Sequence, residues 1–227
     1  MYNTVDTIIV GRLVGTEALA AVGATGPLVN MTNGFFIGVS SGATVVLSQY
    51  YGAGDRKGID DAIHTGVTLS VVLGVMLTLL GVGLGDKVMG MMNMPENCME
   101  DATTYLRIYF AGSVGTVVYN MGAGILRAMG DSKRPMLFLL VTCILNVVLD
   151  LLFVAVLGMG VAGAAWATIL SQLISAVLPI LVLMRMPENR LELKKLRIEG
   201  SLMGRILRIG VPAGLQFVTF DFSNILI

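Results

Sequence analysis

The sequence predicts an all-α protein that crosses a membrane several times. Of its 227 residues, 55% are hydrophobic and only 13% are charged, about half of the charged share of a soluble domain. That leaves too few polar side chains to cover a water-soluble globule of this size. The apolar residues also gather in charge-free intervals, several as long as the roughly 20 residues that a spanning helix needs.

The charge balance excludes several other classes of protein. Lys and Arg together number 15, as do Asp and Glu, so the formal net charge is zero. A basic nucleic-acid-binding protein, an acidic tail and a disordered chain are all inconsistent with that balance. We therefore expect the chain to lie in the lipid bilayer and to bind no nucleic acid.

The first part of the chain predicts three helices, over about 1–14, 18–50 and 59–85. The intervals 18–54 and 62–85 carry no charged side chain, and a polar glycine-rich segment separates them. The apolar run over 4–14 is too short to cross a bilayer by itself. We therefore expect that the first helix is incomplete at this end of the sequence.

Three further helices are predicted over about 102–128, 133–157 and 161–186. Residues 135–184 are interrupted only by Asp150, and the glycines of GMG at 158–160 divide this run into two helices joined by a tight turn. The chain ends inside another apolar run over 209–227, the start of a seventh helix. This end looks cut as well.

The basic residues predict the orientation. Three polar segments on one side of the predicted bundle hold most of them: Arg56, Lys57, Arg127, Lys133, Arg134, Arg185, Arg190, Lys194, Lys195, Arg197, Arg205 and Arg208. Only Arg12, Lys87 and Arg107 lie on the other side. By the positive-inside rule, the richer side faces the cytoplasm of a multi-pass protein in the cell membrane.

The stretch over 186–208 is the one extended polar region. Leu202, Ile206 and Ile209 recur at helical spacing opposite two arginines. This pattern predicts a cytoplasmic amphipathic linker that lies on the inner membrane surface and leads to a second bundle. A solvated linker whose charges only fix the orientation explains the same residues.

Several short motifs suggest a cofactor or metal site, but the residues around them do not fit one. GMGVAG at 158–163 fits a dinucleotide fingerprint, but the apolar run before it is too long for a strand and no acidic residue follows about 20 positions on. Cys98 and Cys143 are too far apart for a CxxC metal site. His64 has no Cys or second His at ligand spacing. These residues therefore predict no metal site.

Three carboxylates lie inside predicted membrane segments: Asp6, Asp150 and Asp221. An acid at that depth costs about 2.5–3.5 kcal/mol or more and indicates a functional site. Asp6 lies roughly 9 Å below the outer membrane edge near Arg12. Asp150 lies roughly 10 Å below the same edge near Leu157. The acids on the first and fifth predicted helices therefore share one layer.

Two neutral polar side chains join this layer. Asn146 precedes Asp150 by four residues and shares its helix face, and Thr168 reaches about the same depth on the next helix. Buried carboxylates can take up and release a proton, whereas carboxylate, amide and hydroxyl oxygens together suit Na⁺. A hydrogen-bonded cluster that only fixes helix packing is the remaining interpretation.

Five segments share a further pattern. They are YNTVDTIIVGRLVGTEALAAVG at 2–23, GATVVLSQYYGAGD at 42–55, ILRAMGDSKRPM at 125–136, NVVLD at 146–150 and GVAGAAWATILSQ at 160–172. In this order and on these helices, the segments resemble the multidrug and toxic compound extrusion (MATE) family. The resemblance covers essentially the whole chain.

The resemblance implies an antiporter of twelve helices in two six-helix lobes, of which this chain holds the first. Such a protein exports organic, often cationic, small molecules in exchange for H⁺ or Na⁺. It needs no further cofactor, performs no enzymatic reaction and is expected to act as a monomer. Because the second lobe is almost entirely missing, this chain alone is not expected to transport.

The resemblance also implies roles for particular residues. The cation-responsive site of the first lobe matches Asp6, Asn146, Asp150 and Thr168, where a Na⁺ ion would sit at the two acids. Tyr105 and Asn120 match pocket-lining positions of the family, with Asn120 much deeper than the outer acid layer.

Three other functions remain as alternatives. A lipid-linked oligosaccharide flippase of the same superfamily would need a cavity rich in basic residues, whereas the interior ionisable residues here are acidic. An intramembrane aspartyl enzyme needs two catalytic aspartates in contact, usually beside glycine-rich loops that the flanks of Asp6 and Asp150 lack. A membrane scaffold would leave the buried acids without a purpose.

Overall fold

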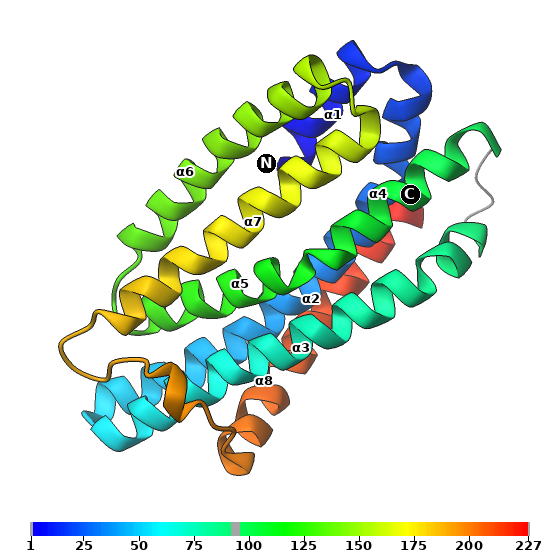
Figure 1. The fold of residues 1–227 in the computed structure, drawn as a ribbon. Helices are drawn as coiled ribbons and strands as arrows, with labels where there is room; N and C mark the ends of the chain where they lie inside the picture. The colour runs from blue at the N-terminus through cyan, green and yellow to red at the C-terminus, as the bar shows by residue number, and fades with distance from the viewer. Residues whose placement is uncertain (1, 92–95, 227) are drawn as a thin grey trace.

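The computed structural model describes residues 2–91 and 96–226, and within them the chain is helical with no β-strand. The all-α prediction is confirmed. Long helices run roughly side by side, and short turns join them at the two ends of the bundle (Figure 1). Among the described residues, four helical segments are long and apolar enough to cross a membrane: Thr16–Ala53, Arg56–Gly85, Lys133–Val156 and Gly160–Met184.

The first helices, in chain order, are α1 Tyr2–Leu13, α2 Thr16–Ala53, α3 Arg56–Met91, α4 Glu96–Ala111 and α5 Ser113–Ala128. They are followed by α6 Lys133–Asp150, the π-helix η1 Leu151–Val156, α7 Gly160–Met184, the 3₁₀ turn η2 Leu193–Lys195 and α8 Gly200–Leu226. The structure differs from the single helix predicted over 102–128, because α4 and α5 are separated at Gly112. A Cβ at Gly112 would meet the side chain of Ile169, so α7 packs directly against the break.

Local chemistry explains the turns between the helices. Gly54 ends α2 in the left-handed conformation at φ 67°, which glycine adopts without a steric penalty. Asp55 then caps α3, because its Oδ1 accepts a hydrogen bond of 3.0 Å from the N–H of Gly58. Gly158 and Gly160 have φ values of 63° and 58°. These positive φ values explain the GMG motif as a tight turn between helices.

The closest helix contact described joins α2 to α8. Gly38 and Gly42 of α2 face Gly210 and Gly214 of α8 so closely that no side chain fits between them. A Cβ at Gly42 would lie 2.7 Å from the backbone N of Gly210, and a Cβ at Gly210 would lie 2.8 Å from the Cα of Val39. Small residues at such crossings let helix backbones approach and pack in a membrane.

Replacing Gly42 with alanine should therefore separate α2 from α8. Overpacking of a close contact costs about 1–3 kcal/mol, so the melting temperature of the detergent-solubilised protein should fall. Gly83→Ala is the matched control, since a Cβ at Gly83 meets nothing within 4 Å and alanine favours helix. An equal fall for both variants would contradict the role assigned to the close approach.

The linker between α7 and α8 differs from the predicted amphipathic helix over 186–208. Residues 186–199 contain only the 3₁₀ turn η2, and α8 begins at Gly200 and continues into the apolar run. Leu191 is 1% exposed and its N–H donates to the Leu183 carbonyl over 3.1 Å. Leu202 and Ile206 are buried in the protein core. The linker thus folds back onto the bundle at Leu191, whereas Leu193, Leu196 and Ile198 stay exposed.

His64 holds this linker against α3. Its Nδ1 lies 2.8 Å from the Asp60 carbonyl oxygen, and its Nε2 accepts a hydrogen bond of 3.1 Å from the N–H of Glu192. A carbonyl only accepts, so Nδ1 carries the proton and the ring is neutral. Arg197 adds ion pairs to Asp60 and Asp61. We call these contacts the linker clasp.

A His64→Leu substitution should loosen the clasp. It leaves the Glu192 N–H without its buried acceptor, which costs about 1–3 kcal/mol, so trypsin should cut at Lys194 and Lys195 faster than in the wild type. Arg56→Gln is the control, because it removes the exposed 3.1 Å ion pair to Glu188, and such pairs contribute little. Unchanged cleavage in the His64 variant would show that the clasp does not hold the linker.

Candidate functional site

The polar residues predicted to share one layer do come together. Asp6 is placed by α1, Asn146 and Asp150 by α6, and Thr168 by α7. Asp6, Asn146 and Asp150 are fully buried, and Thr168 is 1% exposed. We call these four residues the acid cluster.

One direct hydrogen bond joins two helices in the cluster. Thr168 Oγ1 donates to Asp6 Oδ2 over 2.8 Å. The Asp6 carboxyl also lies within interaction range of Asp150 and Asn146. α1, α6 and α7 therefore meet at a single polar point inside an apolar bundle.

Most polar atoms of the cluster lack a hydrogen-bond partner. Asp6 Oδ1, both carboxyl oxygens of Asp150 and both amide atoms of Asn146 are buried and unpaired. None of the described basic side chains forms an ion pair with either acid. Buried polar groups are normally satisfied, and two facing carboxylates repel each other in a medium of low polarity. The cluster therefore suits an added proton or a small cation, whose positive charge both acids would share.

The backbone changes form directly after Asp150. α6 ends there and continues as the π-helix η1, in which the Leu157 N–H donates to the Leu152 carbonyl over 2.9 Å. π-helical turns are rare and are frequently found at functional sites. No sequence signal predicted this feature, because the apolar run over 151–156 is equally compatible with an α-helix.

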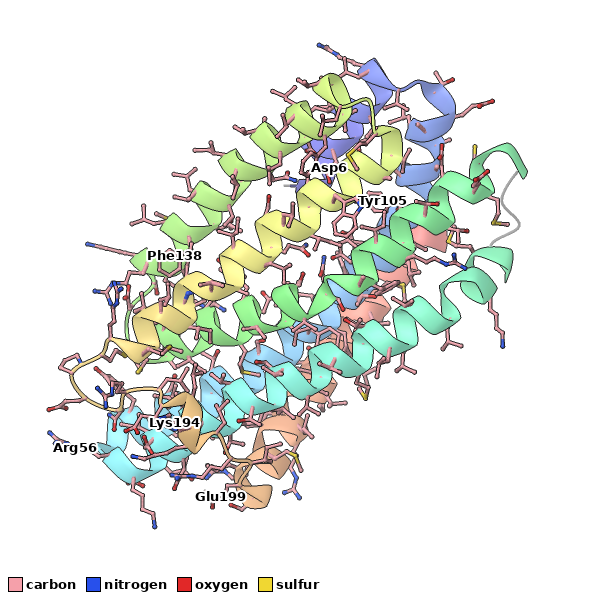
Figure 2. All side chains as sticks on the ribbon, in the orientation of Figure 1. Asp6, Arg56, Tyr105, Phe138, Lys194 and Glu199 are labelled. Atoms are coloured by element: carbon pink, nitrogen blue, oxygen red, sulfur yellow. The ribbon has the colours of Figure 1, made fainter. Side chains whose placement is uncertain are left out.

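Tyr105 lies beside the acid cluster and Asn120 does not. The Tyr105 side chain is 1% exposed and within electrostatic reach of Asp6 and Asp150. Figure 2 shows Asp6 and Tyr105 toward one end of the helices and the linker residue Lys194 at the other. Tyr105 also lines a small cavity of about 110 Å³ among α1, α2 and α4.

Asn120 lines a second, larger cavity of about 160 Å³ among α2, α5, α6 and α7. Its lining residues are all uncharged: Asn33, Ile37, Thr116, Tyr119, Asn120, Leu139, Gln172 and Ser175. We call this space the neutral cavity. It lies between two separate clusters of buried apolar side chains. Sequence reasoning missed all of this lining except Asn120, because single neutral polar residues on a membrane helix carry no distinctive pattern.

Tyr109 connects the neutral cavity to the acid cluster. Its ring stacks on that of Tyr105 with centroids 6.3 Å apart and an interplanar angle of 11°. Its hydroxyl donates to Asn33 Oδ1 over 3.0 Å. The two tyrosines, four residues apart on α4, thus link the two polar regions of the bundle.

Asp221 was the third predicted intramembrane acid, and it lies on α8, but its side chain is outside the described residues. Among the described side chains, no group of three or more His, Cys, Asp and Glu residues could hold a metal ion. A cation at the acid cluster would therefore use two carboxylates together with neutral oxygens.

Comparison with known proteins identifies the family. Residues 1–152 match the MatE family model. The chain belongs to the MATE family. Members of this family are transporters and not enzymes, which excludes the aspartyl enzyme considered above.

Individual MATE relatives agree with this assignment. The chain is 33% identical over 218 residues to a probable multidrug resistance protein, YpnP, of Bacillus subtilis, covering 96% of this chain and 48% of the relative. It is 30% identical to a probable multidrug resistance protein, NorM, of Thermotoga maritima, with 100% and 51% covered. A solved MATE structure in a bent conformation matches with a TM-score of 0.92 at 31% identity, covering 99% of this chain and 50% of that one.

The chain spans about half the length of these MATE relatives. Half of the relatives' length is what one lobe of a two-lobe transporter would occupy. The chain is thus a multi-pass membrane protein of a multidrug efflux family, as the sequence predicted.

We expect the two acids of the acid cluster to lower the stability of the protein. Asp150→Asn removes a carboxylate whose oxygens have no partner and relieves its repulsion with Asp6, so it should raise the free energy of unfolding by about 1 kcal/mol or more. Thermal melting of the purified protein at alkaline pH, where both acids are ionised, measures this. Asp101→Asn, an acid of α4 outside the cluster, should change little. A lower melting temperature for Asp150→Asn would instead assign the cluster a packing role.

Proposed function

We propose that this chain forms the ion-coupling lobe of a MATE antiporter that exports organic compounds in exchange for H⁺ or Na⁺. The observation that carries the proposal is the buried pair Asp6 and Asp150, whose oxygens are largely unpaired. Neither acid has a cationic partner among the described side chains. A transported cation supplies that missing charge when it binds and removes it when it leaves.

The mechanism follows from where the two acids are attached. Asp6 is on α1, whereas Asp150 is on α6 at the start of the π-helix. A bound cation or proton cancels their repulsion and draws α1 and α6 together, and its release lets them separate. Ion binding thereby stabilises one arrangement of the bundle over another. Coupled transport requires such a difference in stability between two conformations.

Alternating access requires this lobe to move against another. The chain matches a MATE transporter in an inward-facing conformation with a TM-score of 0.90, and one in an outward-facing conformation also with 0.90. Equal likeness to both states supports a lobe that keeps its internal structure while its position changes. Downhill entry of the cation then drives export of the substrate.

The expected substrates are organic small molecules that bind mainly through apolar and neutral polar contacts. The neutral cavity offers such a surface, and the acid cluster can attract a cationic compound. Three relatives are described as probable multidrug resistance proteins, and another as an FAD transporter of Shewanella oneidensis. An oligosaccharide flippase has less support, because neither the neutral cavity nor the cavity beside Tyr105 is lined by a basic residue.

The orientation is part of the proposal. The end of the bundle that carries the linker clasp holds most of the basic residues, and the positive-inside rule assigns it to the cytoplasm. The acid cluster then lies in the outer half of the membrane, where it meets external cations first.

Dye transport tests the proposed function. The natural full-length protein is studied in everted membrane vesicles. Uptake of a fluorescent organic cation is followed under an imposed pH or Na⁺ gradient. One gradient should drive uptake, and Asp6→Asn and Asp150→Asn should each abolish it, because a neutral amide neither takes up a proton nor supplies charge to Na⁺.

Asp101→Asn is the control and should transport normally, and the melting temperature of each variant verifies folding. Gradient-driven uptake that survives in folded Asp150→Asn would contradict the coupling role. Absence of uptake of any dye by the wild type would transfer support to the flippase.

A further inference from the structure

A cavity of about 320 Å³ lies at the basic end of the bundle, where α6 begins and α7 ends. Its lining residues are Arg134, Leu181, Val182, Arg185, Met186 and Pro187. This cavity is distant from the acid cluster, because Arg134 is the second residue of α6 and Asp150 is the last. The transport mechanism makes no use of it.

The two arginines give the cavity a net positive charge. Arg134 is 55% exposed and its Nε lies 3.4 Å from Asp131 Oδ2, which leaves the terminal nitrogens of its guanidinium available. Arg185 follows the end of α7, and its guanidinium has no ion pair or hydrogen bond to a described side chain. The nearby acids of the linker have other partners, since Glu188 pairs with Arg56 and Glu192 with Lys195.

The remaining walls of the cavity are apolar and continue into a lipid-facing surface. On α6, Met136, Leu137 and Leu140 are 67%, 51% and 57% exposed. On α7, Leu181 in the cavity wall is 40% exposed. Exposed apolar side chains thus begin two residues from Arg134 and four residues from Arg185. The arginines therefore mark the boundary between headgroups and hydrocarbon.

We propose that this cavity binds the headgroup of an anionic phospholipid. Arg134 and Arg185 donate to the phosphate oxygens, since a guanidinium matches phosphate geometry. The acyl chains lie along the exposed apolar faces of α6 and α7. Basic pockets between membrane helices at the cytoplasmic side favour anionic lipids, and the apolar walls select a lipid over a soluble phosphate.

Native mass spectrometry of the natural full-length protein tests the site. The protein is delipidated in detergent and then titrated with phosphatidylglycerol or phosphatidylcholine that carry identical acyl chains. The wild type should bind phosphatidylglycerol preferentially. The double variant Arg134→Gln with Arg185→Gln should weaken that binding by roughly tenfold or more, because each basic residue near the surface contributes to the attraction.

The matched control is Arg56→Gln with Arg190→Gln. These two arginines are 75% and 61% exposed at the same end of the bundle and lie outside the cavity lining. The control should keep the preference for phosphatidylglycerol. Arg134→Lys with Arg185→Lys, which retains the charge, should keep most of it, and melting temperatures verify that each variant is folded.

Three results would overturn the proposal. They are equal binding of the two lipids by the wild type, an undiminished preference in the folded glutamine variant, and an equal loss in the control. Glycerol 3-phosphate, which has no acyl chain, should not compete with phosphatidylglycerol. If it competes at comparable concentration, the cavity is a soluble-phosphate site and the lipid assignment is wrong.

Discussion

The hydrocarbon core of a bilayer offers no water to polar groups, so every group inside it must find its partner within the protein. The backbone meets this requirement by forming helices. Some hydroxyl side chains meet it locally, since Thr25 donates to the Val22 carbonyl and Thr44 to the Ser40 carbonyl of the same helix. Carboxylates cannot do the same, because an ionised acid only accepts hydrogen bonds. Asp6 and Asp150 are therefore among the buried groups that the helices leave unsatisfied, and they are the ones that can carry a charge.

This unmet requirement is concentrated at one end of the bundle. Three helices from distant parts of the sequence meet at the acid cluster, where the Thr168 hydroxyl of α7 donates to Asp6 of α1. The stacked rings of Tyr105 and Tyr109 link the surroundings of the acid cluster to Asn33, which lines the neutral cavity.

The opposite end of the bundle follows a different principle. There the chain leaves the membrane, and the linker could have been solvated. Instead His64, Arg197 and the buried side chain of Leu191 fix it to α3 and to the end of α7. The linker leads directly into α8, which packs against α2 through glycines. α8 is therefore attached to the rest of this chain both through the linker and through its close contact with α2.

The sequence by itself determined the all-α fold, the membrane location of the helices, the basic end and the layer that contains Asp6, Asn146, Asp150 and Thr168. It could do so because hydropathy, charge and depth along a helix are local properties that follow from spacing. Tertiary structure alone decided the division of α4 from α5, the π-helix after Asp150, the extended linker and the neutral cavity. It also decided which oxygens of the acid cluster stay unpaired. These features depend on which side chains of other helices lie opposite, and the periodicity of a single helix does not specify its partners.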